Sequence, residues 1–196
     1  LNAIIHPRFE KAREEASGNL PDGPFKGVPL LIKDLSCQTA GDPYHAGTKF
    51  LKNLNWTAPK DSYLAELYRK AGFVIVGRTN TPEFGTVTTT EPLAHGPTHN
   101  PWALDRSPGV SSGGSAACVA ARLAPVANGG DGGGSIRIPA SFSGTYGIKP
   151  TQGRVSSFTG LNTAAAVNYT SQQGPLTRTV RDSALMLQVL AGFDAR

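Results

Sequence analysis

The pattern of apolar and polar residues predicts a buried strand near the start of the chain. Residues 28–35 read VPLLIKDL. Because side chains alternate between the two faces of a strand, Lys33 shares a face with Leu31 and Leu35, whereas Asp34 points to the opposite face. The apolar neighbours favour a central strand, and we expect Asp34 to have a structural role.

Helical periodicity follows this strand, and the two kinds of element then alternate. Residues 61–71 carry an apolar stripe at helical spacing, with Ser62 or its neighbour to cap the start and Gly72 to end the helix. Thr179 and Asp182 give a similar capping pattern before the last helix. Further helices are predicted over residues 7–17, 113–123 and 180–192, and strands over residues 73–76 and 124–127 and around Ile148. This alternation indicates an α/β fold with a largely parallel or mixed sheet.

Two glycine-rich segments each contain a serine that could act chemically. GVSSGGSAACVAARL begins at Gly109 and contains Ser111, and GGDGGGSIRIPA begins at Gly129 and contains Ser135. Each segment leads into a structured-looking element, so we interpret both as tight connections. A phosphate-binding loop would need a Lys-Ser or Lys-Thr pair after the glycines, and neither segment has one.

A nucleophile elbow of the α/β-hydrolase type is a further alternative, because GVSSG around Ser111 fits the pattern G-x-S-x-G. That site needs a strand before the serine and a histidine after it. PWALDRSP precedes the motif, and all four histidines lie upstream of it, at positions 6, 45, 95 and 99. A Ser…Asp…His order therefore cannot be completed within this chain.

Lys33 offers a base that such a serine could use without histidine. On an edge strand a lysine points to solvent and discourages aggregation. On a buried central strand it loses solvation, its pKa falls, and it can act as a base near pH 7. The strand by itself leaves both interpretations open.

The glycines before Ser135 make it the better nucleophile of the two serines. These glycines are Gly132, Gly133 and Gly134. They allow successive backbone N–H groups to turn toward one point, which is the geometry of an oxyanion hole beside an attacking hydroxyl. Ser111 is then the better proton relay toward Lys33. Asp131 and Arg137 flank the segment, and we expect them to hold the loop rather than touch substrate.

Composition and charge narrow the class of protein. The chain has 196 residues, 39% of them hydrophobic and 17% charged, which is typical of one soluble globular domain. No apolar run approaches the ~18 residues of a membrane helix. The net charge of +5 comes from scattered residues, which favours a solvated surface over a nucleic-acid patch. Cys37 and Cys118 make neither a disulfide framework nor a zinc site, and with no recognisable signal peptide we expect a reducing, cytoplasmic location.

Four segments together resemble the amidase signature family of serine amidohydrolases. They are GVPLLIKDL, SSGGSAACVAA, DGGGSIRIPASFSGTYGIKPT and GPLTRTVRD, and the resemblance runs over nearly the whole chain. TNTPEFG and VTTTEP…HNPW are most similar to the general amidase branch, which includes nylon-oligomer hydrolases. The resemblance implies a mixed sheet covered by helices on both faces. It also implies that residues 1–196 form the N-terminal and central part of a single domain whose C-terminal part lies outside this chain.

The resemblance further implies hydrolysis of a carboxylic amide to an acid plus ammonia or an amine, through an acyl-enzyme. Carried over residue by residue, Ser135 matches the nucleophile, Ser111 the serine that follows a cis peptide bond, and Lys33 the base. The backbone N–H groups of residues 132–135 match the oxyanion loop. No metal or organic cofactor is implied. The implied partner is a small-molecule amide, without nucleic acid or membrane, and a homodimer is left open.

Two alternative functions remain. The chain could be the glutaminase subunit of a tRNA-dependent amidotransferase, which belongs to the same superfamily and would co-purify with a second protein. It could instead be a catalytically inactive relative that acts as a binding module. Three departures from the usual family pattern motivate this second alternative: Val110 in place of a glycine, and Gly130 and Gly132 in place of threonines.

Overall fold

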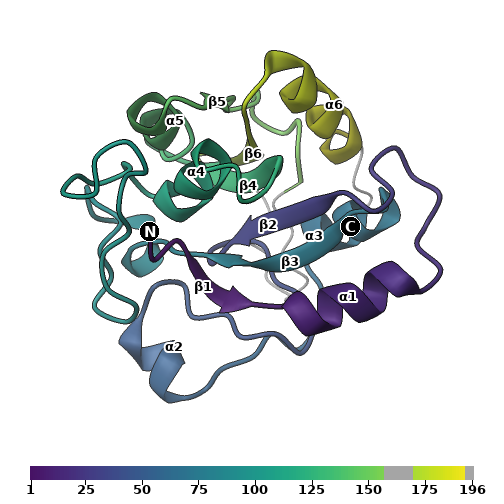
Figure 1. Cartoon of the computed structure of the whole chain (residues 1–196), viewed down its shortest axis with the longest axis horizontal. Helices are drawn as coiled ribbons and strands as arrows, with labels where there is room; N and C mark the ends of the chain where they lie inside the picture. Colours follow the sequence, from purple (N-terminus) through teal and green to yellow (C-terminus); the bar gives the residue numbers. More distant parts are fainter. Residues whose placement is uncertain (157–169, 193–196) are drawn as a thin grey trace.

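The computed structural model describes residues 1–156 and 170–192, which form a mixed six-stranded sheet (Figure 1). The strands are β1 (Ile4–Pro7), β2 (Pro29–Lys33), β3 (Val74–Thr79), β4 (Val126–Asp131), β5 (Tyr146–Gly147) and β6 (Gln172–Thr177). They lie in the order β1-β3-β2-β4-β6-β5. β2 runs parallel to β3 and β4, whereas β1, β6 and β5 pair antiparallel with their neighbours. The predicted α/β fold is confirmed, and β2 is a central strand.

In the described residues, six α-helices and one short 3₁₀ helix (Glu83–Gly85) accompany these strands. The α-helices are α1 (Phe9–Ser17), α2 (Lys49–Asn53), α3 (Tyr63–Lys70), α4 (Gly113–Ala120), α5 (Arg137–Ser143) and α6 (Val180–Leu190). Two predicted caps are confirmed. The Ser62 hydroxyl accepts from the N–H of Ala65 at the start of α3, and the Thr179 hydroxyl accepts from the N–H of Asp182 at the start of α6.

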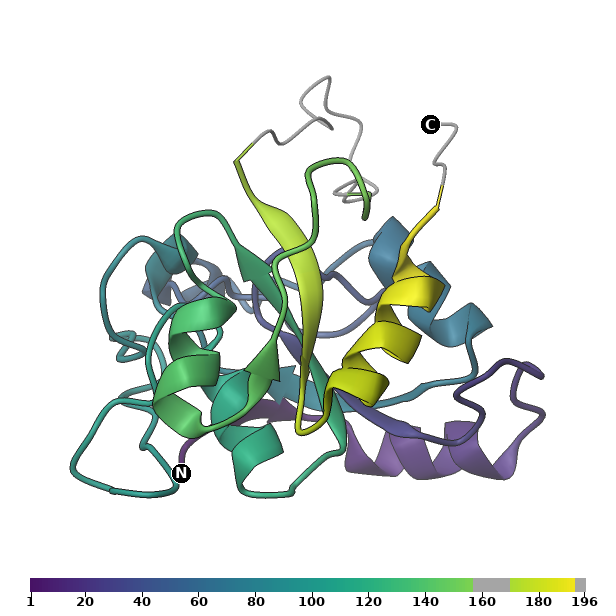
Figure 2. The same cartoon turned by 90° about the horizontal axis from the view of Figure 1, so that it is seen from above.

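Helices cover both faces of the sheet (Figure 2). Leu30 and Ile32 of β2 belong to a core cluster that contains residues of α3 and α6. Leu31, which points to the opposite face, packs with residues of α4. Because side chains of β2 alternate between the two faces of the sheet, this strand packs into both apolar layers. Packing on both faces fixes the position of its end.

The first part of the glycine run after Ala127 is a strand, although the sequence pattern indicates a loop there. β4 runs through Gly129 and Gly130 to Asp131, and all of its residues are buried. A Cβ on Gly129 would lie 2.9 Å from Ser112 Oγ, and one on Gly130 would lie 2.9 Å from a side-chain atom of Gln173. Glycine is needed there because neighbouring groups approach the backbone closely, not because the chain turns.

Other predicted boundaries also shift. The short strand expected around Ile148 is formed by Tyr146 and Gly147 instead, so Ile148 lies just outside β5. The expected strand at 73–76 begins at Val74 and extends to Thr79, and the expected helix at 113–123 ends at Ala120. The sequence patterns did not predict five elements, namely β1, α2, the 3₁₀ helix, α5 and β6.

Within residues 1–156 and 170–192, no helix combines the length and the apolar character that crossing a membrane would require.

Candidate active site

Lys33 is the last residue of β2, at the carboxyl end of a strand with parallel neighbours on both sides. Ligands of open α/β sheets commonly bind at such strand ends. The backbone N–H of Lys33 donates to Asn128 Oδ1 at 2.6 Å, which fixes this end of β2 against β4. Its side chain is only 1% exposed. The ammonium group donates to Ser111 Oγ at 2.6 Å and lies 3.4 Å from the carbonyl oxygen of Gly130.

The surroundings of Lys33 bring its pKa close to neutral pH. Burial lowers the pKa of the Lys33 ammonium to about 7, and the negative charge of Asp131 partly opposes this shift. A lysine with such a pKa is partly unprotonated at neutral pH and can accept a proton. Lys33 is therefore a buried lysine on a central strand, not an exposed lysine on an edge strand.

Ser111 lies just before α4 and is 2% exposed. The peptide bond between Val110 and Ser111 is cis. Gly85 approaches Ser111 from the other side, since a Cβ on Gly85 would lie 3.0 Å from Ser111 Oγ. Backbone and side chains thus enclose the Ser111 hydroxyl, and Lys33 is its hydrogen-bond partner.

Ser135 lies in the turn between β4 and α5 and is half-buried. Its carbonyl oxygen accepts from the N–H of Ser112 at 3.1 Å, which ties the two glycine-rich segments together. A cavity of about 270 Å³ opens beside Lys33, Ser111 and Ser135. Its other lining residues are Leu35, Ser36, Phe84, Gly85, Gly130, Gly132, Gly133 and Ser171. The three predicted residues are therefore brought to one cavity from three distant segments.

Asp131 and Arg137 hold the loop that carries Ser135, as expected. The Asp131 carboxylate accepts from the N–H groups of Gly134, Ile136 and Arg137, and the Arg137 guanidinium pairs with it at 2.9 Å. Burial alone would raise the pKa of Asp131, but the hydrogen bond from Arg137 and those from the backbone lower it to about 2. The carboxylate is thus ionised at any pH near neutrality, and its hydrogen bonds keep the loop in place.

The predicted oxyanion glycines divide into two groups. Gly132 and Gly133 are exposed and line the cavity. Gly134 is buried, is absent from the cavity lining, and gives its N–H to Asp131 Oδ1 at 2.7 Å. The N–H of Gly134 thus serves the loop's own carboxylate, whereas Gly132 and Gly133 lie at the cavity beside Ser135.

Asp34, next to Lys33, has the structural role that its strand face predicted. It is fully buried, accepts from the N–H groups of His45 and Gly47, and faces Arg78 Nε at 3.6 Å. Burial raises the pKa of Asp34 to about 6 against the opposing charge of Arg78. Asp34 thus anchors the loop that follows β2.

The two cysteines are not alternative nucleophiles. Both are buried, and burial raises the pKa of Cys37 to about 11 and that of Cys118 to about 12. Because the thiolate is the reactive form, both side chains are inert near neutral pH.

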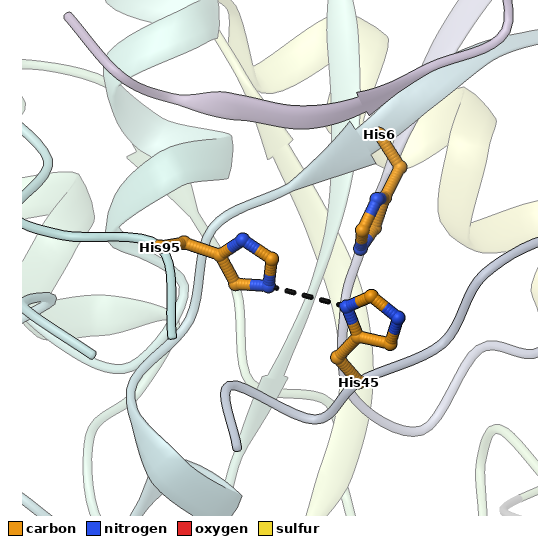
Figure 3. Close-up of side chains that lie close together, drawn as sticks. All are labelled: His6, His45 and His95. Carbon is orange, nitrogen blue, oxygen red and sulfur yellow. Dashed lines mark hydrogen bonds between the residues drawn. The ribbon is translucent and has the colours of Figure 1, made fainter. Parts of the chain in front are cut away.

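A larger cavity, of about 400 Å³, opens at β1 and the start of α1, and it contains none of the predicted site residues. His6 and Arg78 lie in its wall. In the described part of the chain, one group of three potential metal ligands gathers, namely His6, His45 and His95 (Figure 3). Sequence spacing gave no sign of this group, because its members come from three separate segments.

Comparison with known proteins gives one consistent family. Residues 1–196 match the model of the Amidase family. The chain is 49% identical over 192 residues to the 6-aminohexanoate-cyclic-dimer hydrolase of Pseudomonas sp. (strain NK87), and the match covers 98% of this chain and 38% of that protein. It is 44% identical over 204 residues to a glutamyl-tRNA(Gln) amidotransferase subunit of Nocardia farcinica (strain IFM 10152), with coverage of 100% of this chain and 40% of that one.

A solved structure of 6-aminohexanoate cyclic dimer hydrolase complexed with substrate superposes with a TM-score of 0.92 at 47% identity. The match covers 98% of this chain and 39% of that one. The chain thus spans about two fifths of the length of the relatives that it matches.

Proposed function

The chain belongs to the amidase signature family, and from that premise we propose that it carries the catalytic residues of an amide hydrolase. Ser135 is the nucleophile, Ser111 the proton relay and Lys33 the base. The substrate is a carboxylic amide, and the products are an acid plus ammonia or an amine. One observation supports this most directly: a buried lysine lies 2.6 Å from a buried serine hydroxyl, in a cavity that a second, accessible serine shares.

The geometry suits a proton relay that ends on Lys33. In its neutral form Lys33 takes the proton of Ser111, Ser111 takes the proton of Ser135, and the Ser135 oxygen attacks the carbonyl carbon. The backbone N–H groups of Gly132, Gly133 and Ser135 stabilise the tetrahedral oxyanion. When the carbon–nitrogen bond breaks, the proton returns through Ser111 to the leaving nitrogen. Water then attacks the acyl-enzyme by the same relay and releases the acid.

The name of one relative favours a small substrate. The similar hydrolase acts on a cyclic dimer of 6-aminohexanoate according to its name. We therefore propose small aliphatic amides as the first substrates to try, with that cyclic dimer among them.

The glutaminase alternative rests on the 44% identity to an amidotransferase subunit. It differs from a free amidase in one measurable property. A glutaminase of this kind would release ammonia from glutamine and would co-purify with a second protein, whereas a free amidase needs neither glutamine nor a partner.

The proposal is tested by labelling the complete protein with a fluorophosphonate and mapping the modified peptide. We expect one adduct, on Ser135, and a Ser135→Ala variant that loses both the label and at least about 10⁴-fold of amidase activity. Ser141→Ala is the matched control, since Ser141 is an exposed serine on the helix that follows. Absence of any label on the complete protein would instead favour the inactive binding module.

A further inference from the structure

Three histidines from separate segments meet beside β1. His6 lies on β1, His45 in the loop after β2, and His95 in the loop between the 3₁₀ helix and α4. Figure 3 shows the three rings turned toward one another. The ring centroid of His6 lies 4.5 Å from that of His45 and 5.2 Å from that of His95. One nitrogen of each ring lies within 4.8 Å of the others.

The distances approach those of a bound metal ion. Two nitrogens bound to zinc at about 2.0–2.1 Å in tetrahedral geometry are separated by about 3.3 Å. His45 Nδ1 and His95 Nε2 are already 3.4 Å apart. His6 completes the group at a distance that a small side-chain rotation can close. Three imidazoles then occupy three positions and leave the fourth to water or an anion.

His6 supplies an independent sign that the group lacks a ligand. Its Nε2 atom is buried, and no hydrogen-bond partner for it exists within residues 1–156 and 170–192. A buried polar nitrogen without a partner is costly, and a native protein normally satisfies it. His45 Nδ1 and His95 Nε2 are hydrogen-bonded to each other, so a metal ion between the rings would replace that bond and would also supply the missing partner of His6 Nε2.

The protonation state and the type of the ligands restrict which metal ion can bind. Burial and the positive charge of Lys52 lower the pKa values of all three histidines, to about 3 for His6 and about 4 for His95, and the charge of Arg78 adds to the shifts of His6 and His45. The rings are therefore neutral, which is the form that binds metals. The set contains no carboxylate, so it suits ions that prefer imidazole over oxygen ligands and disfavours Ca²⁺ and Mg²⁺. Asp34, which faces Arg78, offsets part of the opposing positive charge.

We propose that His6, His45 and His95 form a binding site for one transition-metal ion of the zinc type, separate from the cavity of Lys33 and Ser135. The ion would tie β1 to the loops at 45 and 95. The site does not depend on the proposed amidase activity, because it shares no residue with it.

The test uses the complete protein, produced without a polyhistidine tag and stripped with a chelator. Titration with Zn²⁺ alone in a calorimeter is expected to give one ion per chain, and Co²⁺ is expected to give the intense visible bands of a tetrahedral site. His6→Ala and His95→Ala are expected to weaken Zn²⁺ binding at least tenfold. His99→Ala is the matched control and is expected to bind normally, because His99 lies outside the group and its Nδ1 contacts the Leu104 carbonyl.

A measurement on the unaltered protein avoids the problem of misfolded variants. X-ray absorption of the one-to-one zinc complex is expected to show three imidazole ligands. No Zn²⁺ binding, a complex with fewer than three imidazoles, or equal binding by the His6, His95 and His99 variants would each overturn the proposal.

Discussion

The two sides of the candidate active site are built in opposite ways. On one side, Lys33 and Ser111 are buried and hydrogen-bonded to each other. On the other, Ser135 is half-buried, and Gly132 and Gly133 are exposed. The buried side removes water from Lys33, the proposed base, and this lowers its pKa. The open side leaves the hydroxyl of Ser135, the proposed nucleophile, accessible from the cavity. In the proposed mechanism the site thus separates proton transfer from substrate access, and each side can be changed by its own substitution.

After the loss of Ser135 itself, replacing Lys33, which breaks the buried side, should have the largest effect. Methionine has a similar length but no amine, so Lys33→Met removes the base while filling the same space. We expect kcat/KM to fall on the order of 10²–10⁴-fold, the usual contribution of a general base. Lys70→Met is the control, because Lys70 is exposed on α3. Amidase assays, with circular dichroism to verify folding, provide the measurement. Near-normal activity of folded Lys33→Met would contradict the relay.

A substitution that crowds Ser111 without removing it tests how sensitive the reaction is to the position of the Ser111 hydroxyl. A Cβ on Gly85 would lie 3.0 Å from Ser111 Oγ, and Gly85 has φ +73°. We expect Gly85→Ala to lower kcat/KM about 10- to 100-fold by displacing the hydroxyl. Gly153→Ala is a close control, since Gly153 has φ +75° and no atom within 4 Å of its added Cβ. Both variants carry a backbone penalty of about 1 kcal/mol, so chemical denaturation should show similar losses of stability. Equal activity in the two would mean that the position of Ser111 is not critical.

Asp131 links the two sides, and its replacement should shift the pH profile of the rate. Because Lys33 must be neutral to act, kcat/KM should rise with pH through an apparent pKa near 7. The charge of Asp131 raises the pKa of Lys33, so Asp131→Asn should lower that pKa and move the rising limb to lower pH.

Arg137→Gln separates this charge effect from loosening of the loop, because it frees the loop but keeps the carboxylate. In Arg137→Gln, the rising part of the pH profile of kcat/KM should not move to lower pH. A limb that shifts equally in both variants would show that loop order, rather than charge, sets the profile. The expected change here is a displacement of the profile, the smallest effect of the three.

Local sequence signals predicted the parts of the fold that depend on neighbouring residues. The cap at Ser62, the cap at Thr179 and the two faces of β2 follow from residues only a few positions apart. For the same reason, the chemistry of the glycine and serine segments could be interpreted from their local order of residues. The pairing of Asp131 with Arg137, six residues later, could also be predicted from the local sequence.

Features that depend on distant residues were missed. The strand β4 has no side chains at Gly129 and Gly130 to show a period, and its character comes from Ser112 and Gln173 packed against it. β1 joins the sheet only by pairing with β3, which lies about 70 residues later in the chain. The hydrogen bond from the Gly134 N–H depends on where the Asp131 carboxylate points. The histidine group has no recognisable sequence motif, because its three residues come from distant segments that meet only in the folded chain.

The contact between Lys33 and Ser111 joins residues 78 positions apart, and that between Lys33 and Gly130 joins residues 97 positions apart. Closing such long loops is slow and entropically costly, and contacts of this kind form late in folding. A chain still emerging from the ribosome, or one that is only partly folded, therefore has neither the desolvated amine nor its serine partner. The proposed reactivity therefore depends on the completed sheet, and we expect an incompletely folded chain to be unreactive toward amides and fluorophosphonates.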